Sequence, residues 1–336
     1  MTGLIVRSIG PSVTVQDRGR PGFVASGLSR GGAVDALALA EGAALLGQSG
    51  DLAVLEMAGF GGLFVAQKDL RIALTGATMQ ATLDGVPLRW NASHGMPEGA
   101  ALKIGAAPSG GYGYLHVGGG IDAPVVMGAR SAHLNSQIGG RVAVGDILPV
   151  GTDPGRIVGL VVKGAAREDG GTIRLVRSFQ TDLFTDAALA RFEATVFHRD
   201  MRGNRMGVQL NPEGEGFQAA GGLTVLSEII MLGDIQMTGD GAPFVLLPEA
   251  QTTGGYPRIG TVLACDLPKL VQARSDAPLR FSFVDMDTAI PAERAFRDQI
   301  KALPSRIKRL HRDPGDVPDL LAYQLISGVA RGDEES

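Results

Sequence analysis

The sequence predicts a mainly β chain with two domains. Its 336 residues suit two domains, at roughly 100 to 200 residues each. Glycine accounts for 49 of these residues, about twice its average usage, without the three-residue period of collagen. Short apolar or alternating runs, each closed by Gly, Pro or Asp, recur along the chain, as in β-sandwiches and barrels.

The strands are expected where these runs occur. The clearest runs are residues 70–74, 101–104, 114–117, 146–150, 172–176, 243–247 and 278–284. A polar, glycine-rich segment at 163–171 (KGAAREDGG) separates two β-rich halves, as linkers between domains do. We therefore place a first domain at 1–165 and a second at 172–285.

Helical periodicity is confined to a few segments. Residues 33–46 place Leu37 and Ala44 on one face, and Thr185 caps a short helix that contains Phe192. These segments predict helices that cover the strands.

A helical C-terminal extension is expected over 286–336. Pro291 is predicted to open a helix with Phe296 and Ile300 on one side, and Leu325 lies in a last helix. Residues 291–312 contain seven Lys or Arg and only two acidic residues. We interpret this basic stretch as a solvated helix face; docking of an acidic partner is the alternative.

Composition excludes several classes of function. A net charge of −4 and a pI near 5.8 argue against nucleic-acid binding. The single cysteine, Cys265, excludes an intrachain disulfide and a Cys-cluster zinc site. Charges at Arg7 and Asp17 interrupt any secretory signal, and no run is apolar enough to span a membrane. A cytoplasmic protein is expected.

Motifs for common chemistries are missing. The sequence contains neither a GxxxxGK(S/T) loop nor a GxGxxG turn before a helix, so no motif indicates a nucleotide site. The five histidines show no metal-ligand spacing, so no metal is expected. No GxSxG elbow is present, and Cys265 lies in an apolar TVLACDL run that is expected to be a buried strand.

Three polar, glycine-rich segments remain as candidate sites. They are 15–35 (VQDRGRPGFVASGLSRGGAVD), 201–206 (MRGNRM) and 251–257 (QTTGGYP). The first could instead be a tight loop held by an ion pair between Asp17 and an arginine. The last places an amide, two hydroxyls and a phenol beside a glycine pair, which suits a small carbonyl-bearing ligand. A hairpin turn is the alternative for it.

Several segments together resemble the biotin-dependent carboxyltransferase family. They are VQDRGRPG, GAVD, the segment 55–62 in which LE is followed by a glycine-rich turn, ALTGA, GGIDAPVVMGARS, GDILPVG, NRMG and VLLPEAQTTGGYP. The resemblance runs in order from about residue 4 to 283. The family includes the C component of 5-oxoprolinase, also described as allophanate hydrolase subunit 2, and the second carboxyltransferase half of urea carboxylase.

The resemblance implies a fold, partners and an activity. The fold would be two cyclophilin-like β-barrel domains with a few covering helices. The free-standing form would work with a B component, of related fold (the allophanate hydrolase subunit 1 type), and with an A component in ATP-dependent cleavage of 5-oxo-L-proline to L-glutamate. No cofactor would be bound covalently. In the urea carboxylase relative, a carboxyl group moves from carboxybiotin on a separate carrier to urea.

The sequence departs from the family pattern at three places. Gly31 stands where relatives commonly have serine, in GGAVD rather than SGAMD. Gly203 and Asn204 replace the first two residues of SDRMG, and residues 232–234 replace a proline and glycine. A different substrate preference could follow from the missing hydroxyl.

Amide and hydroxyl side chains are the first site candidates. Both activities must polarise a carbonyl and hold a planar N–C=O group, which needs oriented hydrogen-bond donors rather than a nucleophile. We therefore expect Asn204, Gln236 and Gln251 to pair with the amide. Thr252 and Thr253 would donate hydroxyl hydrogen bonds.

Charged candidates complete the set. Arg20 and Arg205 suit a substrate carboxylate or a phosphorylated intermediate, because guanidinium binds either in bidentate fashion. Tyr256 adds a phenol for substrate binding. Asp35 and Glu56 are possible bases, although burial against a backbone turn is the favoured interpretation for each.

Three functions therefore compete. The first is the C component of a 5-oxoprolinase, inactive alone. The second is a carboxyltransferase component for urea or a similar amide, with biotin on another chain. The third is a regulatory protein that binds an inhibitor resembling the B component.

Overall fold

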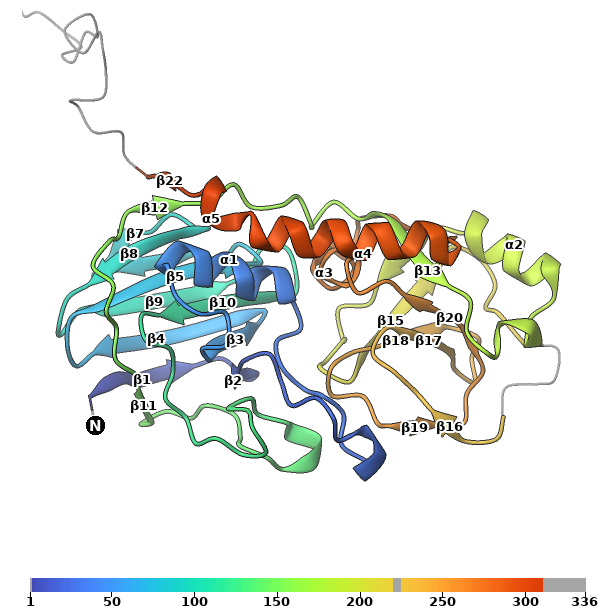
Figure 1. Ribbon diagram of the computed structural model, residues 1–336, viewed down its shortest axis with the longest axis horizontal. Coiled ribbons are helices and arrows are strands. Elements are labelled where there is room, and N and C mark those ends of the chain that lie inside the picture. Colours follow the sequence, from blue (N-terminus) through green and yellow to red (C-terminus); the bar gives the residue numbers. More distant parts are fainter. Residues whose placement is uncertain (1, 220–224, 311–336) are drawn as a thin grey trace, which may run out of the picture.

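The chain folds into two β-rich halves that lie side by side (Figure 1). The computed structural model describes residues 2–219 and 225–310. It confirms the mainly β fold class, with few helices and a closed barrel in the second half. Among the described helices, none is both long and apolar enough to cross a lipid bilayer.

The first half packs two sheets against each other. The six-stranded sheet has the order β11 (Ile147–Pro149), β1 (Gly3–Ile9), β4 (Phe60–Ala66), β9 (Ala101–Ala106), β6 (Ala81–Leu83), β7 (Val86–Pro87). The seven-stranded sheet has the order β2 (Val13–Gln16), β3 (Val54–Ala58), β10 (Tyr112–Val117), β5 (Leu70–Gly76), β8 (Ala92–Met96), β12 (Leu160–Val161), β22 (Lys308–Arg309).

Alternating side chains from both sheets fill the space between them. Leu4 and Phe64 of the first sheet and Leu55, Ile72 and Leu115 of the second belong to one buried cluster. Since successive residues of a strand point to opposite faces, the period of two in the sequence specifies which residues enter this core.

The second half is a closed seven-stranded barrel. Its order is β13 (Gly171–Val176), β20 (Arg258–Val262), β17 (Asp234–Met237), β18 (Pro243–Leu246), β15 (Gly207–Pro212), β14 (Phe197–Arg199), β21 (Leu279–Phe283). A separate pair joins β16 (Glu228–Ile229) to β19 (Thr253–Gly254).

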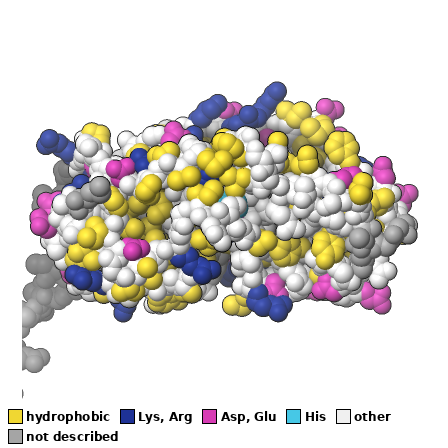
Figure 2. Space-filling model, turned by 90° about the horizontal axis from the view of Figure 1, so that it is seen from below, with side chains coloured by type: hydrophobic (Ala, Val, Ile, Leu, Met, Phe, Trp, Pro, Cys, Tyr) yellow, Lys and Arg dark blue, Asp and Glu magenta, His cyan; other side chains and the backbone are white. Residues whose placement is uncertain are grey.

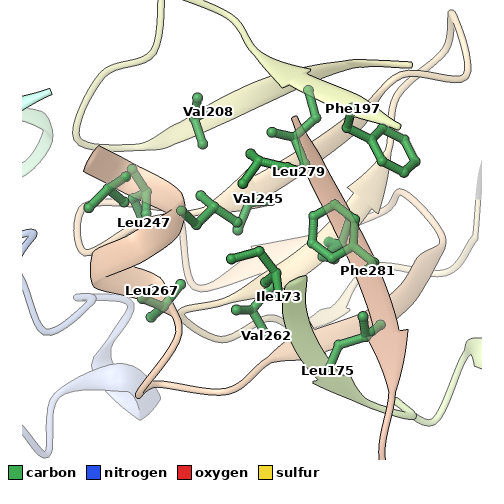
Figure 3. Packing of buried hydrophobic residues seen from close by; sticks show 14 of the residues in the cluster. Ile173, Leu175, Phe197, Val208, Val245, Leu247, Val262, Leu267, Leu279 and Phe281 are labelled. Atoms are coloured by element: carbon green, nitrogen blue, oxygen red, sulfur yellow. The ribbon is translucent and has the colours of Figure 1, made fainter. Parts of the chain in front are cut away.

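Aromatic rings fill one end of the barrel. Phe192, Phe197, Phe217 and Phe281 have ring centroids 5.0–5.9 Å apart in tilted or edge-on pairs. Figure 3 shows Phe197 and Phe281 beside Leu279, with aliphatic side chains of the other strands turned toward them. Such pairs add about 1 kcal/mol each beyond the burial of apolar area.

Helices cover the strands, as expected. They are α1 (Ala36–Leu46), α2 (Asp186–Ala194), α3 (Leu267–Gln272), α4 (Met286–Lys301) and α5 (Leu303–Arg306), with short 3-10 turns η1 (Val24–Ser26), η2 (Leu134–Ser136) and η3 (Thr181–Leu183). The predicted cap of α2 is confirmed, because the Thr185 side chain accepts a hydrogen bond from Ala188 N.

Two helix boundaries differ from the prediction. Helix α1 begins at Ala36 rather than 33, because Asp35 is its N-cap and accepts from Leu37 N and Ala38 N. Helix α4 begins at Met286, one turn before Pro291, because Asp285 caps it. The proline therefore lies inside the helix, where its ring removes one backbone hydrogen bond.

The C-terminal segment packs back onto the first half. Helix α4 runs along the top of both halves (Figure 1), and its Phe296 and Ile300 pack in one cluster with Leu37 and Leu45 of α1. Strand β22 then pairs with β12. The predicted last helix around Leu325 lies outside the described residues, and the domain limits 1–165, 172–285 and 286–336 stay a prediction.

His116 on β10 is buried beneath α1. Its Nε2 lies 2.8 Å from Thr75 Oγ1, and a Cβ placed on Gly42 of α1 would come within 2.2 Å of the ring. Burial lowers the pKa of His116 from 6.5 to about 3. Below pH 6.5 the unfolded chain therefore binds a proton at this position that the folded chain excludes.

When the pH is lowered from 7 to 5, we expect this residue alone to reduce the free energy of unfolding by about 2 kcal/mol. In His116→Gln, which keeps a polar group near Thr75, this part of the pH dependence should disappear, although the variant is less stable overall. Urea titrations of both proteins at the two pH values measure the difference. An equal loss in both proteins would mean that other groups carry the acid sensitivity.

Candidate functional site

Arg205 lies where the two halves meet and binds one carboxylate from each. Its Nη1 contacts Glu56 Oε1 on β3, and its Nε is 2.5 Å from Glu249 Oε1, three residues after β18. Its Nη2 donates to Gly32 O at 2.7 Å. All three side chains are buried. Burial by itself lowers the pKa of Arg205, but Glu56 and Glu249 raise it well above its ordinary value.

The two glutamates are held by further donors. Glu56 Oε2 accepts from the Tyr114 hydroxyl at 2.7 Å and from Val34 N at 2.8 Å. Glu249 Oε2 accepts from Leu134 N at 2.9 Å. Burial and the charge of Glu56 raise the pKa of Tyr114, so the phenol stays a donor. Nearly every acceptor position of Glu56 is therefore filled by the protein itself.

A cavity of about 180 Å³ opens beside this network. It presents carboxylate, guanidinium, amide, hydroxyl and phenol groups. Such a set can hydrogen-bond a small planar N–C=O group on several sides. The cavity is lined by Ser12, Thr14, Glu56, Ala58, Tyr112, Leu134, Asn135, Arg141, Gly203, Asn204, Arg205, Met206 and Glu249.

Asp35 belongs to a second buried network. Its carboxylate caps α1, is 3.0 Å from Arg167 Nη1 and accepts from Gln272 Nε2 at 2.9 Å. Arg167 also pairs with Glu41 at 2.6 Å. The segment at 163–171 is thus more than a solvated linker, since Arg167 is buried and anchors it. Asp35 does not line the 180 Å³ cavity.

The QTTGGYP segment lies over the outside of the barrel. Thr253 and Gly254 form β19, while Gln251 and Tyr256 are exposed and Thr252 is half-buried. The lining of the 180 Å³ cavity includes none of the residues Gln251, Thr252, Thr253, Gly254 and Tyr256.

Gln236 is buried beneath this segment. A Cβ placed on Gly254 would come within 2.4 Å of Gln236 Nε2, so a side chain at this position would collide with the amide. Gln236 Nε2 has no hydrogen-bond partner in the part of the chain that the structure describes.

The segment at 15–35 is a tight loop, but among the described residues no arginine forms an ion pair with Asp17. Asp17 instead accepts from Gly19 N at 2.8 Å and Arg130 N at 2.6 Å, and contacts the Ser131 hydroxyl. Arg20 donates to backbone carbonyls and is not part of the 180 Å³ cavity.

Cys265 does not lie in a buried strand, so that prediction is wrong. Strand β20 ends at Val262, and Cys265 is half-buried in the turn before α3. Burial, together with the charges of Asp266 and Glu293, raises the pKa of the thiol to about 12. The thiolate is therefore scarce at neutral pH.

The structure thus gathers Asn204, Arg205 and Glu56 in one cavity and leaves the other predicted site residues outside it. Glu249, Arg141 and Tyr112 also line the cavity and were not among the site residues predicted from the sequence. Glu249 could have been found from its place directly before AQTTGGYP. Nothing in the sequence around Arg141 or Tyr112 marks them, because the topology alone brings them to the cavity.

One known protein family matches most of the chain. The model described as "Carboxyltransferase domain, subdomain A and B" matches residues 26–283, most of the chain. The chain belongs to this family. The matched region contains Arg205 and both of its glutamate partners, so the junction network lies within the carboxyltransferase domain.

Two relatives of this carboxyltransferase-family chain match along almost their whole length. The C component of 5-oxoprolinase from Haemophilus influenzae is 31% identical over 297 residues, 86% of this chain and 95% of the relative. Its counterpart from Escherichia coli is 33% identical over 315 residues, 92% and 99% of the two chains. A urea amidolyase from Saccharomyces cerevisiae is 23% identical over 333 residues, which are only 18% of that protein.

Solved structures align with most of the chain. The crystal structure of TTHA0988 aligns with a TM-score of 0.76 and 29% identity, over 84% of this chain and 55% of that one. The urea amidolyase from Kluyveromyces lactis shares the fold, with a TM-score of 0.80 at 20% identity over 93% of this chain and 21% of that one.

Arg205→Met should destabilise the carboxyltransferase chain by about 3–5 kcal/mol, because two buried carboxylates would lose their cation. Denaturant unfolding at pH 7 measures the change. The control Lys301→Met removes an exposed ion pair with Asp298 and should leave the midpoint nearly unchanged. A small effect of Arg205→Met would show that the halves do not depend on this contact.

Proposed function

We propose that this chain is the C component of a 5-oxoprolinase, inactive alone, which cleaves 5-oxo-L-proline to L-glutamate together with the A and B components. The similarity to two 5-oxoprolinase C components along nearly their full length carries the proposal. In the reaction the lactam C–N bond breaks, water supplies the new carboxylate oxygen, and ATP is hydrolysed to ADP and phosphate. The protein would act in the cytoplasm.

The 180 Å³ cavity supports this chemistry. 5-Oxoproline carries a planar lactam and a carboxylate. Asn204 lies at the cavity with its amide, and its Oδ1 accepts from Met206 N at 2.7 Å, which fixes the orientation of the side chain. The Nδ2 group would donate to the lactam oxygen, and Arg141, exposed at the same cavity, would attract the carboxylate.

Arg205 and Glu56 take positioning roles in this proposal. The three guanidinium nitrogens of Arg205 are engaged by the protein, so this group holds the glutamates in place rather than binding substrate. Glu56 accepts from three donors, which leaves little capacity for proton transfer. Glu249 accepts from fewer donors and is the better candidate for a base.

Exposed apolar side chains support a role within a complex. Phe179, Leu226 and Met201 are 100%, 86% and 78% exposed. Figure 2 shows hydrophobic patches on the lower face of both halves. Large exposed apolar patches mark contacts with other proteins. The A and B components would supply the ATP site and cover part of this surface.

Carboxyl transfer to urea or a similar amide is the second candidate. The match to urea amidolyase favours it, although only at 23% identity. Biotin would then be attached to a separate carrier, and no cofactor would be bound covalently to this chain.

Reconstitution tests the function. The chain, combined with the A and B components from the same genome, should release glutamate from 5-oxo-L-proline only when ATP and all three proteins are present. Omitting each protein in turn gives the controls. A stable complex that releases no glutamate would refute the proposal and direct the test to carboxybiotin and urea.

Asn204→Ala should lower kcat/KM of that complex by on the order of ten- to a hundredfold, because one hydrogen bond to the lactam is lost in the transition state. Asn211→Ala removes an exposed amide of the barrel and serves as the control, with activity close to wild type. Equal activity of both variants would remove Asn204 from the substrate site.

A further inference from the structure

Arg20 differs from the other buried arginines. It is 1% exposed and has no carboxylate within ion-pair distance in the described part of the chain. Its Nε and Nη2 donate to the carbonyl oxygens of Val126 at 3.3 Å and Ser131 at 2.5 Å, and its Nη1 has no partner among the described residues. Within residues 2–219 and 225–310, the other buried arginines each pair with carboxylates: Arg167, Arg205 and Arg258.

The charge of Arg20 is thus left without a direct counterion. Burial lowers its pKa, while the more distant Asp17 and Glu249 act in the opposite direction. Both of those carboxylates are bound elsewhere, Asp17 by backbone N–H groups and Glu249 by Arg205. A buried cation is costly unless an anion pairs with it. A bound anion would fill this role.

Arg20 lines a cavity of about 400 Å³ in the first half. Arg130 and Arg141 line it too, against a single carboxylate, Asp146, which accepts from Ala143 N. Arg130 already pairs with Asp122 at 2.7 Å, so the positive charge left to the cavity comes from Arg20 and Arg141. The rest of the wall is largely apolar and includes Val15, Val126, Ile138 and Leu148. Of these residues, only Arg141 also lines the 180 Å³ cavity.

We infer that the 400 Å³ cavity binds a small organic carboxylate with an apolar body, whose carboxylate pairs with Arg20. The apolar wall suits the body of such a molecule, and the excess of arginine suits its charge. The inference does not depend on the proposed function. The carboxylate could come from 5-oxo-L-proline itself or from another small acid.

Calorimetric titration of the full chain alone tests the site with three compounds. Cyclopentanecarboxylate should bind, and 2-pyrrolidinone, a five-membered ring without a carboxylate, should not. Binding of 5-oxo-L-proline that depends on Arg20 would identify the substrate as the ligand. Binding of cyclopentanecarboxylate alone would support the site for a different acid. Because no turnover is measured, failure of the proposed function would not affect this result.

Arg20→Met should weaken binding of cyclopentanecarboxylate by on the order of ten- to a hundredfold. Arg18→Met removes an exposed arginine two residues earlier and should bind like wild type. Ala123→Leu, which narrows the cavity at a half-buried wall residue, should also weaken binding and decides the test if Arg20→Met does not fold. No binding to wild type, or unchanged affinity in the folded variants, would overturn the inference.

Discussion

The structure depends on one guanidinium that joins two carboxylates from different halves of the chain. Arg205 and Glu249 come from the second half and Glu56 from the first. Apolar burial has no preferred direction, whereas the planar fork of arginine fixes distance and angle together. This contact therefore sets distance and angle between the two halves at the cavity, within a junction where a buried apolar cluster also contains residues of both halves, among them Leu39 and Leu270.

A second group of polar contacts links the two halves. Gln272 at the end of α3 donates to Asp35 Oδ2 and to Tyr112 O, and accepts from Gly111 N through its Oε1. Tyr112 also lines the 180 Å³ cavity. Both groups of polar contacts involve strand β10, because Tyr114 on the same strand donates a hydrogen bond to Glu56. At the cavity, Arg205, Glu56 and Glu249 are thus held by short hydrogen bonds to the protein, and Tyr112 is held through its backbone, which favours a site that is formed before its ligand arrives.

Much of the fold could be predicted from the sequence, because strands and caps are local patterns. Each of the seven expected strand runs overlaps a strand, with ends that agree within two residues, and Thr185 caps its helix. Pro291 was misplaced because an aspartate cap one turn earlier outweighs the usual preference of proline for the first helical position. Long-range pairing was beyond reach, since no local pattern shows that Arg167 would find Asp35 and Glu41.

The site could be predicted only in part, for the same reason. The NRMG segment pointed to Asn204 and Arg205, and both line the 180 Å³ cavity, but what surrounds them there depends on residues far away in sequence. Arg205 looked free to bind a substrate carboxylate, whereas two glutamates occupy it. Gln236 looked accessible but lies beneath Gly254.

The return of the chain to the first half has a consequence for self-association. Strand β12 would be an open sheet edge if β22 did not pair with it at Leu160 and Val161. Unpaired edges recruit strands from other molecules and lead to aggregation, and short, lysine-bearing edge strands discourage this. With only Lys308 and Arg309, β22 has both features. The segment after α5 therefore protects the sheet from pairing with a second copy.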